Sequence, residues 1–523
     1  MSSLNNSIIY EIYPTSFYDS NGDGIGDING ITEKLDYVKE LGADVIWINP
    51  IYKSPFKDGG YDIIDHCAVD KRFGTLEDVD KLINKAHKLG IKVLFDLVIG
   101  HTSDKHPWFL QSKKAKRNKY SDYFIWTDNI FIGGSNTVKG MAKRDGNYMV
   151  NYYSFQPALN YGFVKVDNST NDVWSSGNYK MHYTDQRLTP LREEVLKIID
   201  FWMQKGIDGF RVDLSGNMIK GGRDLTALKW FYDRVIGKTK EKYPNAIFLA
   251  EWGSPEFSTE CGFDIDYLNH ESKGYNELLR GDKNTNIMPN FENGNSYFSA
   301  NGQGTKKPLV DYLEQLKHVL KADKYYSIPS GYHDMVRLAE KRDNDSLKCV
   351  FAFLLTYKNV PLIYYGDEIG MAHNYKLNKD GGYIRTGART PMHWDNTINR
   401  GFSTAKRTYL PVGKQKDICV KSQQEDESSL LNTIKRLIEI RKSEPALWFD
   451  SSITVERETE YPFIYTRGNK DCEIFVAINP TRKNIKLNKR IEEVLFSLNC
   501  NTEDGLITLK GKSFIIAKVK GEN

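Results

Sequence analysis

The sequence predicts an α/β protein, a (β/α)8 barrel that carries one inserted subdomain and a small C-terminal antiparallel β-domain. Three observations lead to this prediction. Short apolar segments alternate with amphipathic helical segments up to about residue 450, which is typical of a parallel sheet with right-handed crossovers. The alternation stops between residues 102 and 186 and then resumes. After residue 451 it gives way to short apolar or alternating runs.

Eight apolar segments are predicted as barrel strands, the number that closes a TIM barrel. They are residues 8–13, 45–50, 92–99, 209–214, 247–251, 263–267, 325–330 and 361–365. Helical periodicity is clearest at residues 29–41, 75–88, 190–204 and 429–443. The expected domains are a catalytic barrel over 1–101 and 187–450, an inserted subdomain over 102–186, and a C-terminal β-sandwich domain over 451–523.

Composition narrows the class of protein. The chain has 523 residues, 40% of them hydrophobic, which is enough for a large core. Its net charge of +4 is spread along the chain and gives no footprint for nucleic acid or a membrane surface. We find no signal peptide and no apolar run long enough to span a membrane. The six cysteines are scattered without CxxC spacing, so we expect a cytoplasmic protein with free thiols.

Charged residues gather where the predicted strands end. The strand at 209–214 carries Arg211 and Asp213, which lie two residues apart and therefore share one face. Because active sites of such barrels lie at the carboxyl ends of the strands, we expect several strand ends to meet at one mouth. The other strand ends contribute Asp96, His101, Glu251, His333 and Asp334.

Two close carboxylates are what retaining cleavage of a glycosidic bond requires. One attacks the anomeric carbon, and the other protonates the leaving oxygen and then activates water. A third carboxylate can stabilise the positive charge that develops on the sugar ring. Any one of these acids could instead be a solvated loop residue, but their joint placement favours a catalytic site.

These segments resemble the signature regions of the α-amylase superfamily of glycoside hydrolases. The matching regions are residues 96–101, 209–213, Glu251 with its flanks, 333–334, and 156–160, the last close to the oligo-1,6-glucosidase version. The resemblance implies that Asp213 is the nucleophile, Glu251 the general acid/base and Asp334 the transition-state stabiliser. It further implies that the innermost sugar is held by His101, Arg211 and His333.

Two further segments indicate exo action. Residues 58–62 resemble the family segment in which an Asp binds the non-reducing end and a Tyr stacks beneath it, which assigns Asp58 and Tyr61 to the site. Residues 389–395 resemble the segment whose Arg pairs with that Asp. An Asp58–Arg389 pair would close the pocket behind the innermost sugar and admit only a chain end. A loop salt bridge is the alternative for Arg389.

A loop after the first strand has the pattern of a cation site. Residues 19–27 place oxygen-bearing side chains at alternate positions, as a Ca²⁺ loop does, but the twelfth residue is Gly30, so the closing Glu of an EF-hand is absent. The resembling enzymes carry a structural Ca²⁺ or Mg²⁺ here. A metal-free Asx turn is the alternative. The implied ligands are Asp19, Asn21, Asp23, Asp27 and the carbonyl oxygen of Ile25.

Several positions depart from the family pattern. Gly100 and Tyr332 stand where Asn is usual, Ala158 replaces an Asp, and His393 replaces a Gln. Leu214, directly after the expected nucleophile, is closest in bulk to the Val of α-1,6-specific relatives, so we favour α-1,6 or mixed linkage.

Three functions stay open. The first is a retaining exo-acting α-glucosidase that hydrolyses short α-glucosides. The second is an α-glucosyl transferase or isomerase of the trehalose synthase, sucrose isomerase or amylosucrase type, which differs only in excluding water from the acceptor side. The third is a catalytically inactive sugar-binding or scaffold protein. We expect a monomer whose partner is a small oligosaccharide or disaccharide.

Overall fold

A computed structural model describes residues 4–134, 136–166, 179–222, 224–280, 296–320, 323–415, 417–469 and 472–519. Its central sheet has eight parallel strands in the order β11-β10-β9-β8-β5-β2-β1-β12, and a parallel bridge between Pro329 and Leu362 joins the two ends. The barrel prediction is therefore confirmed, strand by strand. The strands are β1 (Ile9–Ile12), β2 (Val45–Ile48), β5 (Lys92–Leu97), β8 (Gly209–Val212), β9 (Ile247–Ala250), β10 (Ile265–Tyr267), β11 (Tyr325–Ser327) and β12 (Leu362–Tyr364).

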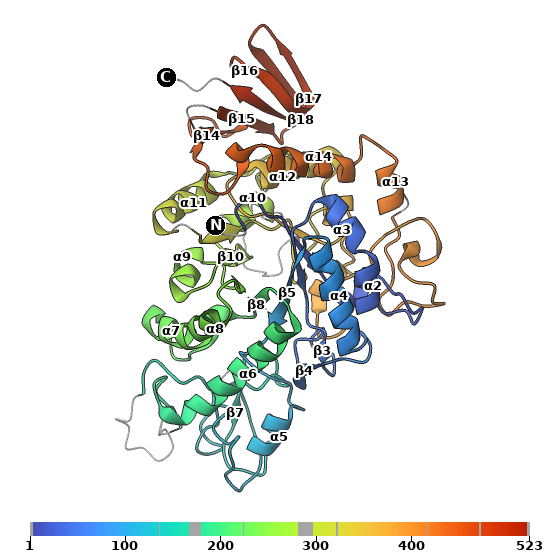
Figure 1. Cartoon of the computed structure of the whole chain (residues 1–523). Helices are drawn as coiled ribbons and strands as arrows, with labels where there is room; N and C mark the ends of the chain where they lie inside the picture. The colour runs from blue at the N-terminus through green and yellow to red at the C-terminus, as the bar shows by residue number, and fades with distance from the viewer. Residues whose placement is uncertain are drawn as a thin grey trace.

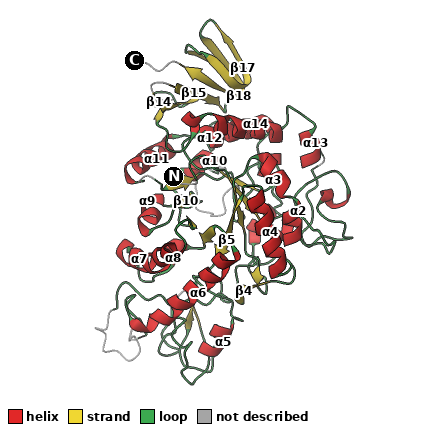
Figure 2. Ribbon diagram, in the orientation of Figure 1, coloured by secondary structure: helices red, strands yellow, loops and turns green. Residues whose placement is uncertain are grey.

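Helices surround these strands (Figure 2). The predicted helix over 29–41 is divided in two at Lys34, whose backbone (φ −90°, ψ 3°) leaves the helical region. A capping box between Thr75 and Asp78 starts the next helix. The helices are α1 (Pro14–Phe17), α2 (Ile28–Glu33), α3 (Leu35–Leu41), α4 (Leu76–Lys88), α5 (Pro107–Ser112), α6 (Thr189–Lys205), α7 (Leu225–Tyr232), α8 (Lys238–Lys242), α9 (Pro255–Ser258), α10 (Tyr275–Leu279), α11 (Lys307–Val319), α12 (Asn344–Thr356), α13 (Val420–Gln424) and α14 (Leu430–Ser443). The described helices include none with the length and apolar character to cross a membrane.

The barrel strands are buried on both faces, which explains their nearly continuous apolar sequences. The first residue of β8 has to be a glycine, because a Cβ on Gly209 would lie 2.0 Å from the carbonyl oxygen of Ile247 on β9. This close approach fixes the register of β8 against β9, in which Arg211 pairs with Leu249. The charged end of β8 is thereby held beside the end of β9.

The inserted subdomain follows β5 and forms the lower part of the molecule in Figure 1. It contains α5 and a two-stranded sheet of β6 (Thr137–Val138) and β7 (Tyr148–Met149). Residues 167–178 of the predicted subdomain lie outside the described residues. A second small sheet, β3 (Tyr52–Lys53) and β4 (Asp65–Val69), follows β2 and was not predicted.

The C-terminal domain lies at the opposite end of the molecule, with α12 and α14 between it and the barrel (Figure 1). Its described strands join one antiparallel sheet through the long β18, which pairs with β15 through residues 513–519 and with β16 through residues 506–509. The sandwich arrangement expected from the sequence stays a prediction. The strands are β13 (Ile453–Val455), β14 (Phe463–Asn469), β15 (Cys472–Asn479), β16 (Ile485–Asn488), β17 (Glu493–Glu503) and β18 (Leu506–Val519).

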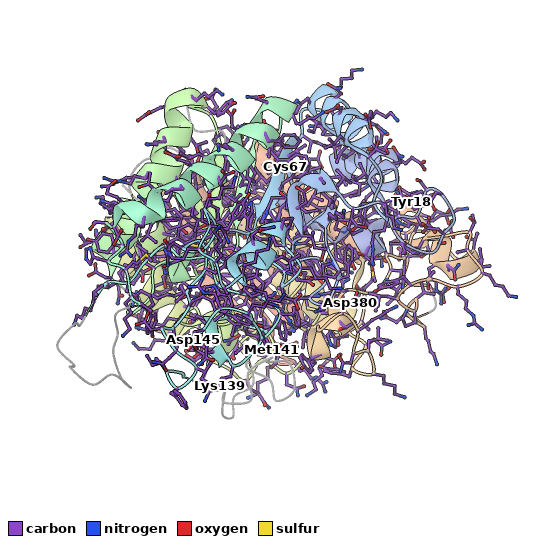
Figure 3. All side chains as sticks on the ribbon, turned by 90° about the horizontal axis from the view of Figure 1, so that it is seen from below. Tyr18, Cys67, Lys139, Met141, Asp145 and Asp380 are labelled. Atoms are coloured by element: carbon purple, nitrogen blue, oxygen red, sulfur yellow. The ribbon has the colours of Figure 1, made fainter. Side chains whose placement is uncertain are left out.

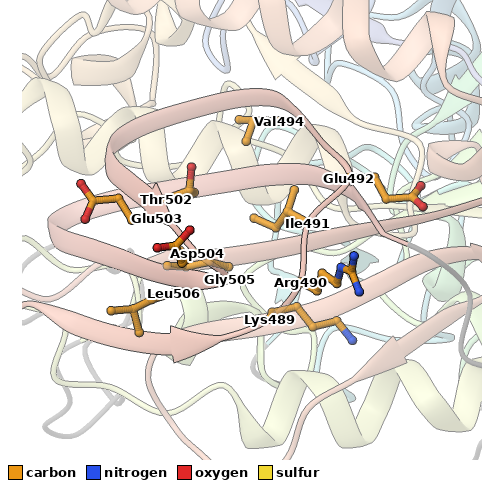
Figure 4. A pocket seen from close by; sticks show the side chains of 11 residues that line it. Lys489, Arg490, Ile491, Glu492, Val494, Thr502, Glu503, Asp504, Gly505 and Leu506 are labelled. Carbon is orange, nitrogen blue, oxygen red and sulfur yellow. The ribbon is translucent and has the colours of Figure 1, made fainter.

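A cavity of about 580 Å³ opens on this domain, lined by residues 489–492, 494 and 502–507 (Figure 4). Its lining is a mixture of aliphatic and oppositely charged side chains without an aromatic ring. It lies on the C-terminal sheet, away from the strand ends that carry the predicted carboxylates.

Candidate active site

The guanidinium of Arg211 is the centre of a buried cluster at the carboxyl ends of the barrel strands. Its Nη1 donates to Asp96 Oδ1 at 2.5 Å and to Asp213 Oδ1 at 3.0 Å. Its Nη2 lies 2.7 Å from Glu251 Oε2 and donates to the hydroxyl of Tyr267 at 3.0 Å. One cation therefore contacts three carboxylates, one within β5 and two at the residues directly after β8 and β9. Asp213 and Glu251 lie on adjacent nitrogens of the same planar group.

The environment of Asp213 and Glu251 favours retention of a proton on the pair. Burial, followed by the charge of Glu251, raises the pKa of Asp213 well above its ordinary value. Burial also raises the pKa of Glu251, against the opposing effect of Arg211. Two acids so close together cannot easily be ionised at the same time. The pair is therefore suited to share one proton, which an acid and a nucleophile require together.

Leu214 turns the chain sharply after Asp213. Its backbone lies in the left-handed region (φ 45°, ψ 40°), where a leucine is strained by about 1 kcal/mol. In this conformation its N–H donates to Glu251 Oε2 at 2.8 Å. The backbone after one carboxylate thus fixes the position of the other.

Asp334 is held by two arginines. Arg389 Nη2 lies 2.5 Å and Arg385 Nη1 lies 3.0 Å from its Oδ1. Although burial raises it, the pKa of Asp334 is held well below its ordinary value, chiefly by the charge of Arg385, with Arg389 also contributing. Asp334 is therefore ionised at neutral pH, as a group that stabilises positive charge has to be.

His333 lies beside Asp334 and beneath an aromatic ring. Its Nε2 is 3.6 Å from Asp334 Oδ2, and its Nδ1 lies 2.7 Å from Glu11 Oε1 on β1. The ring stacks on Tyr61 with centroids 5.1 Å apart and planes at 8°. Burial lowers the pKa of His333 well below its ordinary value. A neutral imidazole in this position can donate or accept a hydrogen bond to a sugar hydroxyl.

Asp58 contacts a different arginine from the one predicted. Its Oδ1 lies 3.3 Å from Arg385 Nη2, and its Oδ2 accepts from Gln156 Nε2 at 2.7 Å. The expected Asp58–Arg389 pair is wrong in this structure, because Asp334 engages Arg389 and Arg385 bridges the two aspartates. Arg385 follows Asp380 by five residues, and Figure 3 labels Asp380 together with Lys139, Met141 and Asp145 of the inserted subdomain.

His101 reaches the cluster from the end of β5. It is 2% exposed and its Nε2 contacts the carbonyl oxygen of Tyr61 at 3.1 Å, while its Nδ1 has no hydrogen-bond partner among the described residues. Burial lowers the pKa of His101 to about 4. The unpartnered nitrogen is itself buried.

At two positions that depart from the family pattern, other polar groups occupy the surrounding space. The space beside Gly100 is occupied by Asn151, whose Nδ2 donates to the Gly100 carbonyl oxygen at 2.7 Å. Tyr332 is buried and its hydroxyl contacts His270 Nδ1 at 2.8 Å. Both substitutions therefore alter the surroundings of the cluster without removing one of its carboxylates.

The loop over residues 19–27 is closed by its own hydrogen bonds. Asp19 accepts from the backbone N–H groups of Gly22 and Gly24, and Asp27 accepts from Ser20 and Gly30. Among the described residues, no three His, Cys, Asp or Glu side chains converge to hold a metal. Ca²⁺ binding by Asp19, Asn21, Asp23, Asp27 and the carbonyl oxygen of Ile25 stays a prediction.

The structure thus brings Asp58, Tyr61, His101, Arg211, Asp213, Glu251, His333, Asp334 and Arg389 into one cluster. The site contains residues that the sequence did not identify. Glu11 was hidden inside an apolar strand, although a lone carboxylate in such a strand is itself a signal. Arg385 lies in the short 3₁₀-helix η6 (Tyr383–Ala388), Arg389 follows directly after it, and both contact Asp334 Oδ1. Gln156 lay in a recognised segment without an assigned role.

Comparison with known proteins gives consistent results. The family model described as the α-amylase catalytic domain matches residues 11–450. The chain is 30% identical to an oligo-1,6-glucosidase of Heyndrickxia coagulans over 96% of each chain. It is 32% identical to one of Parageobacillus thermoglucosidasius over 91% of this chain and 90% of the relative. The crystal structure of the trehalulose synthase MutB from Pseudomonas mesoacidophila MX-45 superposes with a TM-score of 0.81 at 25% identity, covering 99% of both chains.

Proposed function

Because the chain belongs to the α-amylase family of enzymes that act on α-glucosides, we propose that it is a retaining exo-acting α-glucosidase for short α-1,6- or α-1,4-linked glucosides. One observation carries the proposal: Arg211 contacts both Asp213 and Glu251, at 3.0 and 2.7 Å. Retaining enzymes use two carboxyl groups about 5 Å apart, and the contact of both acids with one guanidinium supports such a separation.

In the proposed first step, the Asp213 carboxylate attacks the anomeric carbon while the glycosidic C–O bond breaks. Glu251 gives its proton to the departing oxygen, and the glucosyl unit becomes an ester of Asp213. In the second step Glu251 takes a proton from water, whose oxygen attacks the anomeric carbon and releases Asp213. Asp334 stabilises the positive charge on the ring in both transition states. Two inversions leave the product in the α configuration.

Exo action is supported by the contacts around Asp58. Its two oxygens are engaged by Arg385 and Gln156, and Arg385 also reaches Asp334. We propose that these groups bind the hydroxyls of the terminal glucosyl unit, so that no further sugar follows it. Chain ends and disaccharides are then the substrates. Leu214 beside Glu251 keeps α-1,6 or mixed linkage as the proposed preference.

The test combines product analysis with a variant. Purified enzyme should release glucose from isomaltose or maltose, and NMR should detect the α-anomer before mutarotation. Asp213→Asn should lower kcat at least 10³-fold, whereas Asp504→Asn, an exposed acid of the C-terminal domain, should keep wild-type activity. Release of the β-anomer, or a fully active Asp213→Asn protein, would refute the assignment.

Transfer to a sugar acceptor is the second candidate, supported by the likeness to trehalulose synthase MutB over nearly the whole chain. Both reactions share the glucosyl–Asp213 ester and differ in what attacks it. Chromatography of the products from sucrose, maltose and trehalose distinguishes them. Glucose as the main product supports the hydrolase, and an isomeric disaccharide supports the transferase.

A further inference from the structure

Glu11 is a buried carboxyl group that the proposed reaction does not use. It lies in β1 and is 0% exposed. Its Oε1 lies 2.7 Å from His333 Nδ1 and accepts from the His333 backbone N–H at 3.3 Å. No hydrogen-bond donor of the described residues reaches its Oε2, which is buried as well. Because an unsatisfied oxygen of a buried carboxylate is costly, the contacts of Glu11 disfavour its ionised form.

The charges around Glu11 also disfavour ionisation. Burial is the largest effect and raises the pKa of Glu11 well above its ordinary value, while smaller effects of Asn49 and Arg211 oppose it. Arg211 is already in contact with three other carboxylates. Its single positive charge cannot neutralise a fourth. The charged or titratable groups that face Glu11 are His333, Asp96, Arg211 and Tyr364.

The other ring nitrogen of His333 indicates where its proton lies. Nε2 is 3.6 Å from Oδ2 of Asp334, which two arginines hold in its ionised form. Burial is the largest effect on His333 and lowers its pKa well below the ordinary value, so the ring carries one proton only. If that proton were on Nδ1 and donated to Glu11, the lone pair of Nε2 would face the Asp334 carboxylate. With the proton on Nε2, the same contact is attractive.

Asn49 supports a lone pair on His333 Nδ1. Its Nδ2 lies 3.3 Å from Nδ1 and 3.4 Å from Asp96 Oδ2. Trp47 Nε1, which can only donate, contacts the same Asp96 oxygen at 2.7 Å. That oxygen is therefore an acceptor, and the Asn49 atom that faces it is the amide nitrogen. An amide nitrogen beside Nδ1 suits an acceptor there and opposes a second N–H.

We infer that Glu11 is a neutral carboxylic acid whose O–H donates to His333 Nδ1 and thereby keeps the ring proton on Nε2. Glu11 is then a positioning residue, because it orients the imidazole and fixes which of its nitrogens donates. His333 presents an N–H beside the acceptor carboxylate of Asp334. A sugar hydroxyl fits between them, since it can accept from the one and donate to the other. This role toward the substrate rests on the proposed function, whereas the assignment of the proton does not.

Nitrogen-15 NMR of enzyme labelled at its histidine side chains measures the proton directly. The shifts of the two ring nitrogens distinguish the Nε2–H tautomer, the Nδ1–H tautomer and the imidazolium ion. The His333 signals are those lost in His333→Gln. We expect the Nε2–H tautomer in the wild-type enzyme at pH 7. An Nδ1–H tautomer or an imidazolium ion would overturn the inference.

Glu368 provides the matched control for this measurement. It is equally buried, and its Oε1 accepts from the hydroxyls of Tyr10 and Tyr37 at 2.7 and 2.8 Å. Glu368→Gln should leave the His333 signals in place. Glu11→Met, which fills a similar space without a donor, should shift the signal of His333 Nδ1, because that nitrogen loses its hydrogen-bond donor. A signal unchanged in Glu11→Met would contradict the contact.

Glu11→Gln tests the charge of Glu11, because an amide imitates a neutral acid that donates. The folded wild-type chain retains a proton on Glu11 that the unfolded chain releases above about pH 4, so this group lowers stability as pH rises. Glu11→Gln lacks that loss. Its thermal midpoint relative to wild type should rise by about 1 °C per pH unit between pH 5 and pH 7. A relative midpoint that stays constant or falls would refute a neutral Glu11.

Activity provides a further measurement. Glu11→Gln should keep kcat/KM on isomaltose within about threefold of wild type, whereas Glu11→Met should lower it about tenfold or more. The pH profile of Glu11→Gln should not move, because the cluster loses no charge. A profile shifted to lower pH indicates a lost negative charge and would count against the inference, as would equal losses in both variants. If wild-type enzyme releases no glucose, the proposed function fails, and the NMR signals and thermal midpoints still decide the state of Glu11.

Discussion

Replacement of Arg211 should show how much the stability of the folded protein depends on the cation that the three carboxylates share. Arg211→Met leaves Asp96, Asp213 and Glu251 buried without their shared guanidinium. Loss of one partner from a buried ion pair costs about 3–5 kcal/mol. With an unfolding entropy of about 2.1 cal/mol/K per residue, a chain of 523 residues gives about 1.1 kcal/mol/K. The thermal midpoint should therefore fall by about 3–5 °C at pH 7.

The pH dependence of this deficit tests its cause. Without the cation, the pKa values of the three carboxyls rise further above their unfolded values near 4. The folded variant then holds more protons than the unfolded chain, so its stability falls as pH rises from about 4. The deficit relative to wild type should be small at pH 4.5 and larger at pH 7.5, measured by differential scanning calorimetry.

Arg441 provides the matched control. It is equally buried, but its guanidinium donates to the carbonyl oxygens of Leu355 and Asn359 and, among the residues that the structure describes, to no carboxylate. Arg441→Met should be destabilised by a similar amount at both pH values. If the Arg211→Met deficit is also independent of pH, the account of three carboxylates sharing one cation is wrong.

Three other outcomes are expected. Glu251→Gln should lower kcat/KM on disaccharides by about 10²–10⁴-fold. The rate of glucosyl-enzyme formation from α-glucosyl fluoride should fall much less, because the departing fluoride needs no proton. Equal losses on both substrates would contradict the acid role of Glu251. Arg385→Met should raise the pKa of Asp334, because Arg385 is the main charge that lowers it. The acidic limb of the kcat/KM profile against pH should then move to higher pH. An acidic limb at the wild-type pH would contradict this effect of Arg385 on Asp334. If residues 19–27 bind Ca²⁺, CaCl₂ at 100 times Kd should raise the free energy of unfolding by about 2.7 kcal/mol and should raise the thermal midpoint. Asp23→Ala should abolish this response. A wild-type midpoint that neither CaCl₂ nor a chelator changes would contradict the predicted Ca²⁺ site.

The barrel was predictable because each strand is short, apolar and separated from the next by a helix or a long polar segment. Strand ends such as Asp213 and Glu251 followed directly, since parallel strands all deliver their carboxyl ends to one rim. The division of the first helix at Lys34 was not predictable, because its sequence keeps helical periodicity across the break.

The pairing of arginines and aspartates could not be read from the sequence. Arg385 and Arg389 carry the same charge, and only the backbone of η6 decides which reaches Asp58. The change of partner along β18 was likewise not predicted. It occurs near Lys512, where φ is 55°, and depends on the three-dimensional bend of the strand.

The barrel's closure has a consequence for how the protein is made. β1 is hydrogen-bonded to β2 on one side and to β12 on the other, with Ile9 opposite Leu362. While the chain leaves the ribosome, one edge of its very first strand stays without a neighbour until Tyr364 has emerged. An open, apolar strand edge invites pairing with other chains, so the nascent protein is most vulnerable to self-association during synthesis of the segments that carry its acids.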